Sequence, residues 1–258
     1  MNSAEGVYGL VLALLFAIAA GLVGSFALMK RMLLASDVMS HVALPGLGLA
    51  FLLGFDPLVG AASSLFLGTL LIWQLQEKTG MATEAMIGVV FAGSLAIGAA
   101  LTPQQDLIEA LFGRFQPLSL PTFLLGLVSV FLIIFVIFRF KDQLVLSLFS
   151  SELAAATSVP VSRLNLYFLL AFSLTVLVGL RFMGALLAGT LVIIPAATGR
   201  RWASNLSQFL LGSCLFSVAA VTSGLLITTF LLPRSTLGPI VILISALFFG
   251  VSLLKQTS

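Results

Sequence analysis

The residues best suited to chemistry lie in one apolar stretch, "LLASDVMSHVALPGLGLAFLLG", which runs from Leu33 to Gly54. Asp37 precedes His41, the only histidine of the 258-residue chain, by four positions. On a helix, residues at this spacing lie on one face, one turn apart. A carboxylate and an imidazole suit zinc, manganese or ferrous iron. Because charged groups inside an apolar span usually face a water-filled path or a partner, the pair is a candidate metal site.

Two neighbouring residues bear on the shape of this segment. Pro45 cannot donate a hydrogen bond to the carbonyl of His41, which frees that oxygen and favours a bend, and Gly46 permits close approach of another backbone. The alternative interpretation makes Asp37 a helix N-cap and His41 a hydrogen-bonded bundle residue. Two ligands do not complete a zinc site, which prefers four. A homodimer would supply two of each across a two-fold axis.

Several catalytic patterns are missing from the sequence. It contains no G-x-x-x-x-G-K-[ST] phosphate loop, no H-E-x-x-H, no CxxC pair and no nucleophile elbow. The chain is therefore not expected to hydrolyse ATP on its own, and a membrane-embedded hydrolase is disfavoured. Transport, a channel, or a membrane subunit of a larger assembly remain.

The composition requires a lipid environment. Hydrophobic residues make up 60% of the chain and charged residues 8%, with a mean hydropathy of +1.22, whereas soluble domains are about 25% charged. Apolar runs of about 20 residues predict membrane-spanning helices rather than barrel strands, which would alternate. We expect one all-α transmembrane domain over residues 1–258, with nine spans, or eight if one segment is broken. The predicted spans are 7–29, 36–54, 57–76, 82–102, 119–138, 164–180, 182–199, 205–231 and 237–254.

The basic residues lie between these spans, so they indicate topology rather than nucleic-acid binding. With the N-terminus outside, three arginines fall outside and nine basic residues inside, which favours that orientation. The outer set is Arg114, Arg181 and Arg234; the inner set is Lys30, Arg31, Lys78, Arg139, Lys141, Arg163, Arg200, Arg201 and Lys255. An internal polar segment from Lys141 to Asn165 is expected to hold a short helix around Glu152.

Five blocks, in chain order, resemble the permeases of the metal-specific ABC-3 group, which are the membrane subunits of zinc and manganese ABC importers. "SDVMSHVALPGLGLAFLLG" is similar to the family signature G-D-x-x-S-H-x-x-L-P-G, with Ser36 in place of the usual glycine. The other blocks are "ATEAMIGVVFAGSLAIGAAL" from Ala82, "LIEALFG" from Leu107, "SSELAAATSVPVSRLN" from Ser150 and "FMGALLAGTLVIIPAATGRRWASNLSQ" from Phe182. Together they cover most of the chain.

The resemblance implies a type II ABC importer-like fold, a homodimer in a prokaryotic inner membrane, two cytoplasmic ATPases and an extracytoplasmic metal-binding protein. It implies that Asp37 and His41 pass the metal, which we expect to be zinc, manganese or iron, with no permanently bound cofactor. We expect gating to come from the bend at Pro45 and Gly46. The stretch after Pro195 corresponds to the ATPase-contacting helix. From its composition we expect a proline-broken span followed by a small surface helix; the coupling candidates are Ala197, Thr198, Arg200 and Arg201.

Two acids are secondary candidates. Glu84 opens a predicted span, where the helix dipole favours an acid, and Glu152 lies in the internal segment. Two other functions stay open: a proton-coupled secondary transporter that uses Asp37 and His41 as a proton relay, and an ABC permease for metal chelates.

Overall fold

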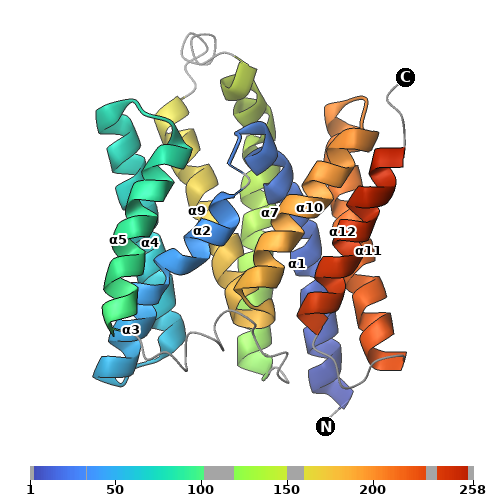
Figure 1. Ribbon diagram of the computed structural model, residues 1–258, viewed down its shortest axis with the longest axis horizontal. Coiled ribbons are helices and arrows are strands. Elements are labelled where there is room, and N and C mark those ends of the chain that lie inside the picture. The colour runs from blue at the N-terminus through green and yellow to red at the C-terminus, as the bar shows by residue number, and fades with distance from the viewer. Residues whose placement is uncertain (1–2, 33, 102–118, 150–159, 231–236, 255–258) are drawn as a thin grey trace.

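The computed structural model describes residues 3–32, 34–101, 119–149, 160–230 and 237–254, and over these residues it is a bundle of helices without strands (Figure 1). In chain order the helices are α1 (Ser3–Met29), α2 (Ala35–Val42), α3 (Leu44–Leu53), α4 (Pro57–Thr79), α5 (Thr83–Leu101), α7 (Leu120–Phe149), α9 (Val161–Met183), α10 (Ala185–Trp202), α11 (Leu206–Phe230) and α12 (Leu237–Leu254). The predicted all-α fold is confirmed.

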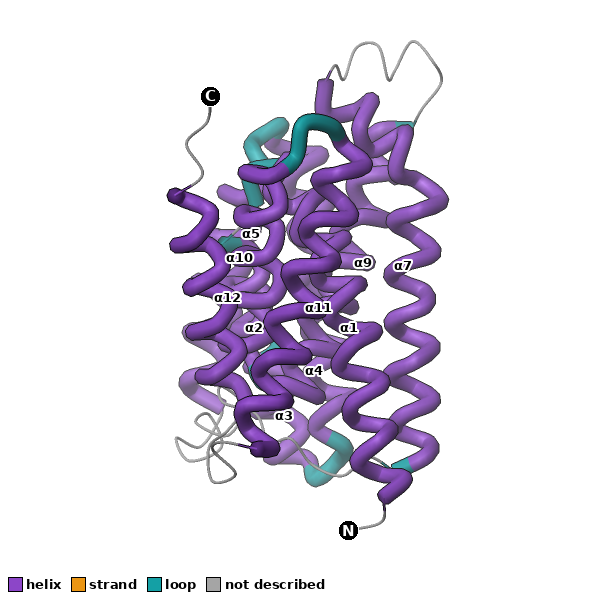
Figure 2. Tube along the Cα trace, turned by 90° about the vertical axis from the view of Figure 1, so that its right-hand side faces the viewer, coloured by secondary structure: helices purple, strands orange, loops and turns teal. Residues whose placement is uncertain are grey.

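The helices run roughly alongside one another between two ends of the bundle (Figure 2). Seven segments are long and apolar enough to cross a membrane, and one of these is the combined segment Ala35–Leu53 that holds α2 and α3. Helices α10 and α12 extend between the same two ends (Figure 1). The described part of the chain therefore crosses the bundle nine times, which is the larger of the two predicted span counts.

A single glycine separates the two spans whose division was uncertain from sequence. Gly184 lies between α9 and α10 with φ 86° and ψ 158°, a backbone conformation that only glycine adopts readily. The chain reverses there without a longer loop, and Arg181 in the last turn of α9 lies at the end opposite to most basic residues.

Helix α7 differs from the prediction. It ends at Phe149 rather than at residue 138, so Lys141 to Phe149 are helical and not part of a loop. Lys141 and Asp142 interrupt the apolar pattern but do not interrupt the backbone hydrogen bonds of a helix, which can extend beyond the hydrocarbon layer. Glu152 and the short helix expected around it lie outside the described residues.

Helix α1 lies at the centre of the bundle, in contact with α7, α9, α10 and α11. Its buried face is made largely of small residues, and a Cβ placed on Gly24 would come within 2.0 Å of the Val192 carbonyl oxygen of α10. Such close backbone approach is how membrane helices gain packing energy where lipid supplies no hydrophobic contrast. The lipid-facing sides of α5, α7 and α12 carry exposed large apolar residues.

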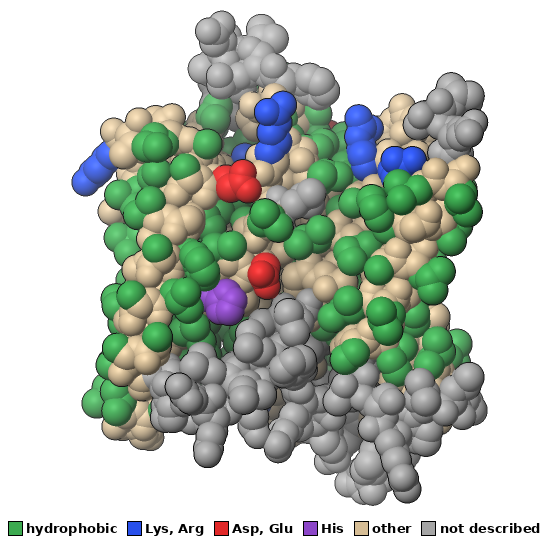
Figure 3. All heavy atoms as spheres, in the orientation of Figure 1, with side chains coloured by type: hydrophobic (Ala, Val, Ile, Leu, Met, Phe, Trp, Pro, Cys, Tyr) green, Lys and Arg blue, Asp and Glu red, His purple; other side chains and the backbone are tan. Residues whose placement is uncertain are grey.

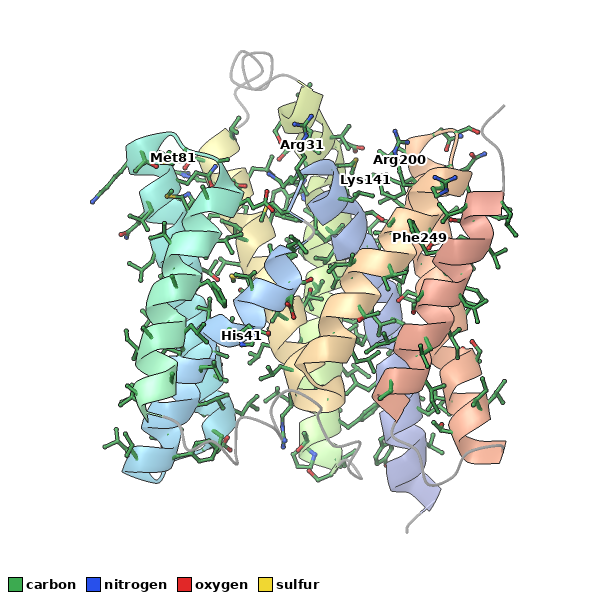
Figure 4. All side chains as sticks on the ribbon, viewed as in Figure 1. Arg31, His41, Met81, Lys141, Arg200 and Phe249 are labelled. Carbon is green, nitrogen blue, oxygen red and sulfur yellow. The ribbon has the colours of Figure 1, made fainter. Side chains whose placement is uncertain are left out.

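One end of the bundle is basic. Arg31, Lys141 and Arg200 are labelled there in Figure 4, and blue side chains gather at the same end in Figure 3. A hydrogen-bonded chain ties four helices together at this end: Lys30 Nζ donates to Asn165 Oδ1 (3.0 Å), and Asn165 Nδ2 (2.6 Å) and Thr83 Oγ1 (2.9 Å) donate to Gln76 Oε1. By the positive-inside rule we expect this end to face the cytoplasm.

Candidate metal site

The candidate ligands lie on α2, a helix of only eight residues that crosses the middle of the bundle (Figure 1). Asp37 lies in its first turn and His41 in its last turn. The helical spacing predicted from the sequence is therefore present, and it places both side chains on the same side of α2.

The break that ends α2 comes from Pro45. The chain passes through Ala43 and begins α3 at Leu44, with Pro45 in the first turn of α3, where a missing N–H costs least. The Ser64 hydroxyl of α4 donates to the Val42 carbonyl at 2.6 Å and so satisfies one oxygen released at the break. The helix is interrupted where the sequence predicted a bend, although Ala43 between α2 and α3 keeps helical dihedral angles (φ −73°, ψ −22°).

Helix α3 is held against α4 at a contact between two glycines. A Cβ on Gly46 would lie 1.9 Å from the Gly60 carbonyl oxygen, and a Cβ on Gly60 would lie 2.2 Å from that of Gly46. Backbone therefore meets backbone at this crossing, as predicted for Gly46. Because α2 continues into α3 across a single residue, this contact also fixes where Asp37 and His41 lie.

Three other helices surround the ligand pair. The His41 ring is half-buried, with its centroid 5.7 Å from that of Phe91 on α5. A Cβ added to Gly189 of α10 would lie 3.8 Å from the Asp37 backbone, so α10 passes α2 at van der Waals distance. The Ser40 hydroxyl donates to the Asp37 carbonyl at 2.6 Å. Helix α9 also contacts α2.

The Asp37 side chain is exposed, and neither Asp37 nor His41 forms an ion pair within the part of the chain that the structure describes. Figure 3 shows the imidazole and a neighbouring acidic side chain on one face of the bundle, between the two ends. His41 is labelled at this depth in Figure 4. An ionised carboxylate is costly in contact with lipid, so this face requires water or another protein surface over it.

One copy of the chain does not complete a metal site within its described residues. No group of three or more His, Cys, Asp or Glu side chains is close enough to hold an ion there. Two ligands fall short of the four that zinc prefers. A cation at Asp37 and His41 would therefore need ligands from water, from outside the described residues, or from a second copy.

The secondary candidate Glu84 does not join the pair. It is exposed in the first turn of α5, and Phe91, the α5 residue beside His41, follows it by about two turns, or roughly 10 Å of helix. Its position matches a carboxylate that stabilises a helix N-terminus. Glu152 lies outside the described residues, as do Asp106 and Glu109 of the segment between α5 and α7.

The coupling candidates lie toward the C-terminal end of α10, at the basic end of the bundle. Arg200 and Arg201 are exposed in its last turn; Arg201 Nε donates to the Ser252 carbonyl of α12 at 3.2 Å. Ala197 is half-buried, and buried Thr198 donates to the Ile194 carbonyl at 2.9 Å. Of the four candidates, only Arg200 and Arg201 are exposed and so available to a partner.

The predicted break at Pro195 and the separate surface helix after it are wrong. Helix α10 continues through Pro195 to Trp202, and α11 begins at Leu206. Asn205 caps α11, because its Oδ1 accepts from the Gln208 N–H at 2.8 Å while Gln208 Oε1 accepts from the Ser204 N–H at 2.9 Å. This reciprocal capping starts a long helix directly and leaves only a short connection between the two helices.

Sequence reasoning missed Phe91 and Gly189 as neighbours of the ligand pair. Both lie in apolar spans far from Asp37 along the chain, where a phenylalanine or a glycine is ordinary. The only signal for Gly189 was the run of small residues in "ALLAGT", which indicates close helix packing without naming the partner.

Comparisons with known proteins agree with this architecture. Residues 7–256 match the ABC 3 transport family. The chain is 31% identical over 251 residues to the manganese import system permease protein ScaB of Streptococcus parasanguinis, covering 94% of this chain and 88% of that protein. It is 26% identical over 256 residues to the high-affinity zinc uptake system membrane protein ZnuB of Buchnera aphidicola, covering 96% and 97%.

A solved structure, PsaBC from Streptococcus pneumoniae in complex with Fab, shares the fold with a TM-score of 0.81 and 27% identity, covering 98% of this chain and 92% of that one. The helical bundle is thus that of an ABC transporter permease. The chain belongs to the ABC 3 transport family, as its five sequence blocks indicated.

Proposed function

We propose that this chain is the permease subunit of an ATP-driven importer for divalent transition metal ions: zinc, manganese or iron. The observation that carries the proposal is the Asp37–His41 pair, which lies at mid-depth on a bundle face, in a chain of the ABC 3 transport family. The uptake and import functions named for ZnuB and ScaB support the direction of transport. The metal is cargo, and no permanent cofactor is invoked.

Two copies of the chain form the path. An exposed Asp37 cannot face lipid, and a second copy placed over this face would bring two carboxylates and two imidazoles together across a two-fold axis. Four nitrogen and oxygen ligands suit zinc and manganese. Metal would enter from an extracytoplasmic binding protein at the end that carries Gly54, and it would leave at the basic cytoplasmic end.

A separate pair of ATPases supplies the energy. The sequence has no phosphate loop, so this subunit does not itself hydrolyse ATP. The docking surface that we propose is the cytoplasmic end of α10 with Arg200 and Arg201, and Glu152 is a second candidate contact on that side. Helix α10 also passes Asp37 at Gly189, so movement of its cytoplasmic end can reach the ligand pair. Multi-pass insertion in a prokaryotic cytoplasmic membrane follows from this role.

The test uses the complex of this chain with its ATPase, reconstituted in liposomes. His41→Ala and Asp37→Asn each remove a metal ligand and should each reduce zinc or manganese uptake by at least about tenfold, which corresponds to a loss of about 1.4 kcal/mol of binding free energy. Asp142→Asn is the matched control, because Asp142 is an exposed acid on α7 that lies outside the site. Wild-type uptake by a correctly assembled His41→Ala complex would refute the proposal.

The same liposomes separate the two alternatives. A proton-coupled carrier would take up metal in response to a proton gradient without the ATPase, whereas the proposed importer requires ATP and the partner subunit. A chelate permease would transport the chelated ion and ignore the free one. Family membership weighs against the proton-coupled carrier.

A further inference from the structure

Helix α10 contains a proline that the proposed function does not use. Pro195 lies in the middle of the helix, yet α10 runs on to Trp202. Because proline has no N–H, the Leu191 carbonyl loses the donor that an unbroken helix would provide. Leu191 is fully buried at 0% exposure, so lipid headgroups and bulk water do not reach this oxygen. Membrane helices tolerate such prolines where serine hydroxyls or ordered waters bond the freed carbonyl.

Two buried hydroxyls also lack partners. Ser217 of α11 is 0% exposed and Ser245 of α12 is 1% exposed, and neither Oγ has a hydrogen-bond partner within the described residues. Ser213, one turn before Ser217 on α11, instead donates to the Phe209 carbonyl of its own helix at 2.8 Å. Ser217 and Ser245 therefore have hydrogen-bonding capacity that their own helices do not use.

The helix register brings these three groups to one level. A Cβ on Gly199 of α10 would lie 2.6 Å from Ser213 Oγ of α11, so these two residues lie at the same level. Because α10 and α11 run antiparallel, Pro195, four residues before Gly199, is level with Ser217, four residues after Ser213. Arg201 of α10 donates a hydrogen bond to the Ser252 carbonyl of α12. Because α12 runs parallel to α10, Ser245 and Ile194, each seven residues earlier, are also level.

The contact between α11 and α12 agrees with this alignment. The rings of Phe216 and Phe248 lie 6.0 Å apart, which brings Ser217 and Ser245 to similar heights on the antiparallel pair α11 and α12. Each of the three helices packs against the other two. The Leu191 carbonyl and the two hydroxyls thus lie within about one helical turn, or roughly 5.4 Å, along the bundle axis.

Helix α10 is tightly packed both before and after Pro195. On one side, Gly24 of α1 lets the Val192 carbonyl approach closely; on the other side, Gly199 lies against the Ser213 backbone of α11. The proline lies between these two tight contacts. One half of α10 carries Gly189, which lies beside Asp37, and the other half carries Arg200 and Arg201.

We propose that a water molecule binds where α10, α11 and α12 meet at the level of Pro195. It donates one hydrogen bond to the Leu191 carbonyl and exchanges two more with the hydroxyls of Ser217 and Ser245. Three hydrogen bonds are typical of a buried protein water. The hydrated proline is a hinge between the half of α10 beside Asp37 and the half that ends in Arg200 and Arg201. The hinge role rests on the proposed function, whereas the water site does not.

Hydroxyl-radical labelling by X-ray radiolysis of the purified complex tests the water site directly, with water itself as the probe. Radicals formed from a bound water should oxidise the buried segment 190–196, and Ser217→Ala combined with Ser245→Ala should abolish this labelling. Ser213→Ala is the matched control and should retain it, because that hydroxyl already bonds its own helix. Wild-type labelling of this segment no higher than that of equally buried Ile133 would overturn the proposal.

A proline substitution tests the link between the carbonyl and the hydroxyls. Pro195→Ala restores an N–H to the Leu191 carbonyl, so it should raise the thermal unfolding midpoint. The double serine substitution should lower the midpoint in the wild-type background and change it little in Pro195→Ala. Equal serine effects in both backgrounds would overturn the water site. Radical labelling and the thermal unfolding midpoint do not depend on transport, so both results would hold even if the proposed function failed.

Uptake by Pro195→Ala tests the hinge. A stiffened α10 should slow ATP-driven metal uptake several-fold while metal affinity stays unchanged, because Asp37 and His41 are untouched. Unchanged uptake by Pro195→Ala, when labelling of segment 190–196 is lost in the same variant, would overturn the hinge role and leave the water site of the wild-type protein standing.

Discussion

The metal site that we propose consists of two side chains in each copy of the chain. The sequence predicted Asp37 and His41 because an acid and the only histidine stand four residues apart in an apolar segment, and the structure places both on α2 as expected. The surroundings of the pair could not be predicted. Phe91 and Gly189 come from distant segments, and only tertiary packing decides which apolar residue faces α2.

At the residue scale we predict that metal binding weakens on acidification. An imidazole coordinates a metal only through a free nitrogen lone pair, so protons compete with the ion for His41. Apparent affinity for zinc or manganese, measured by titration calorimetry on the reconstituted complex, should fall as the pH is lowered.

The control for this prediction is His41→Gln, which keeps a polar side chain but has no basic nitrogen. The residual affinity of that variant should depend less on pH than that of the wild type. An affinity that stays flat with pH in the wild-type protein would contradict ligation by His41.

At the scale of the elements, apolar runs predicted most helices closely. Helix α11 was expected over 205–231 and is found at Leu206–Phe230, and α12 was expected and found over 237–254. The errors arise where a side-chain pattern and backbone hydrogen bonding diverge. Lys141 did not end α7, because a polar side chain does not interrupt the backbone hydrogen bonds of a helix. Pro195 did not end α10, which is packed against α1, α9, α11 and α12.

We predict that the crossing of α3 and α4 is intolerant of a single methyl group. Gly46→Ala would place a Cβ 1.9 Å from the Gly60 carbonyl oxygen, and both atoms belong to packed backbone that must move apart. The expected loss of stability is about 1–3 kcal/mol, seen as a lower thermal unfolding midpoint, with weaker metal binding because α2 shifts with α3.

Gly250→Ala is the matched control for this crossing. A Cβ there would meet nothing within 4 Å, so the change should alter stability by less than about 1 kcal/mol. A Gly46→Ala protein as stable as this control would show that the glycine contact does not hold α3 in place.

At the scale of the whole molecule, two asymmetries define how the bundle works. Basic side chains gather at one end, and the His41 imidazole lies with a neighbouring acidic side chain on one face between the ends (Figures 3 and 4). The first asymmetry orients the chain in the membrane; the second requires a covering surface. The orientation could be predicted from basic residues alone, whereas the covered face emerged only once α2 was seen to lie at the surface.

The orientation predicts where the ATPase docks. With Cys214 first replaced by serine, single cysteines at exposed Ser204 and Ser207, beside Arg200 and Arg201, should crosslink to the ATPase in the assembled complex. Phe55→Cys, which is exposed at the opposite end between α3 and α4, is the matched control and should not crosslink.

Arg200→Glu combined with Arg201→Glu should lower crosslinking and uncouple ATP hydrolysis from uptake, because like charges would replace a complementary contact. Correct insertion of that variant is checked by labelling the cysteine at position 55 from outside intact cells. Capture of the ATPase by the Phe55→Cys end, or by the loop around Asp106, would overturn both the docking surface and the orientation of the bundle.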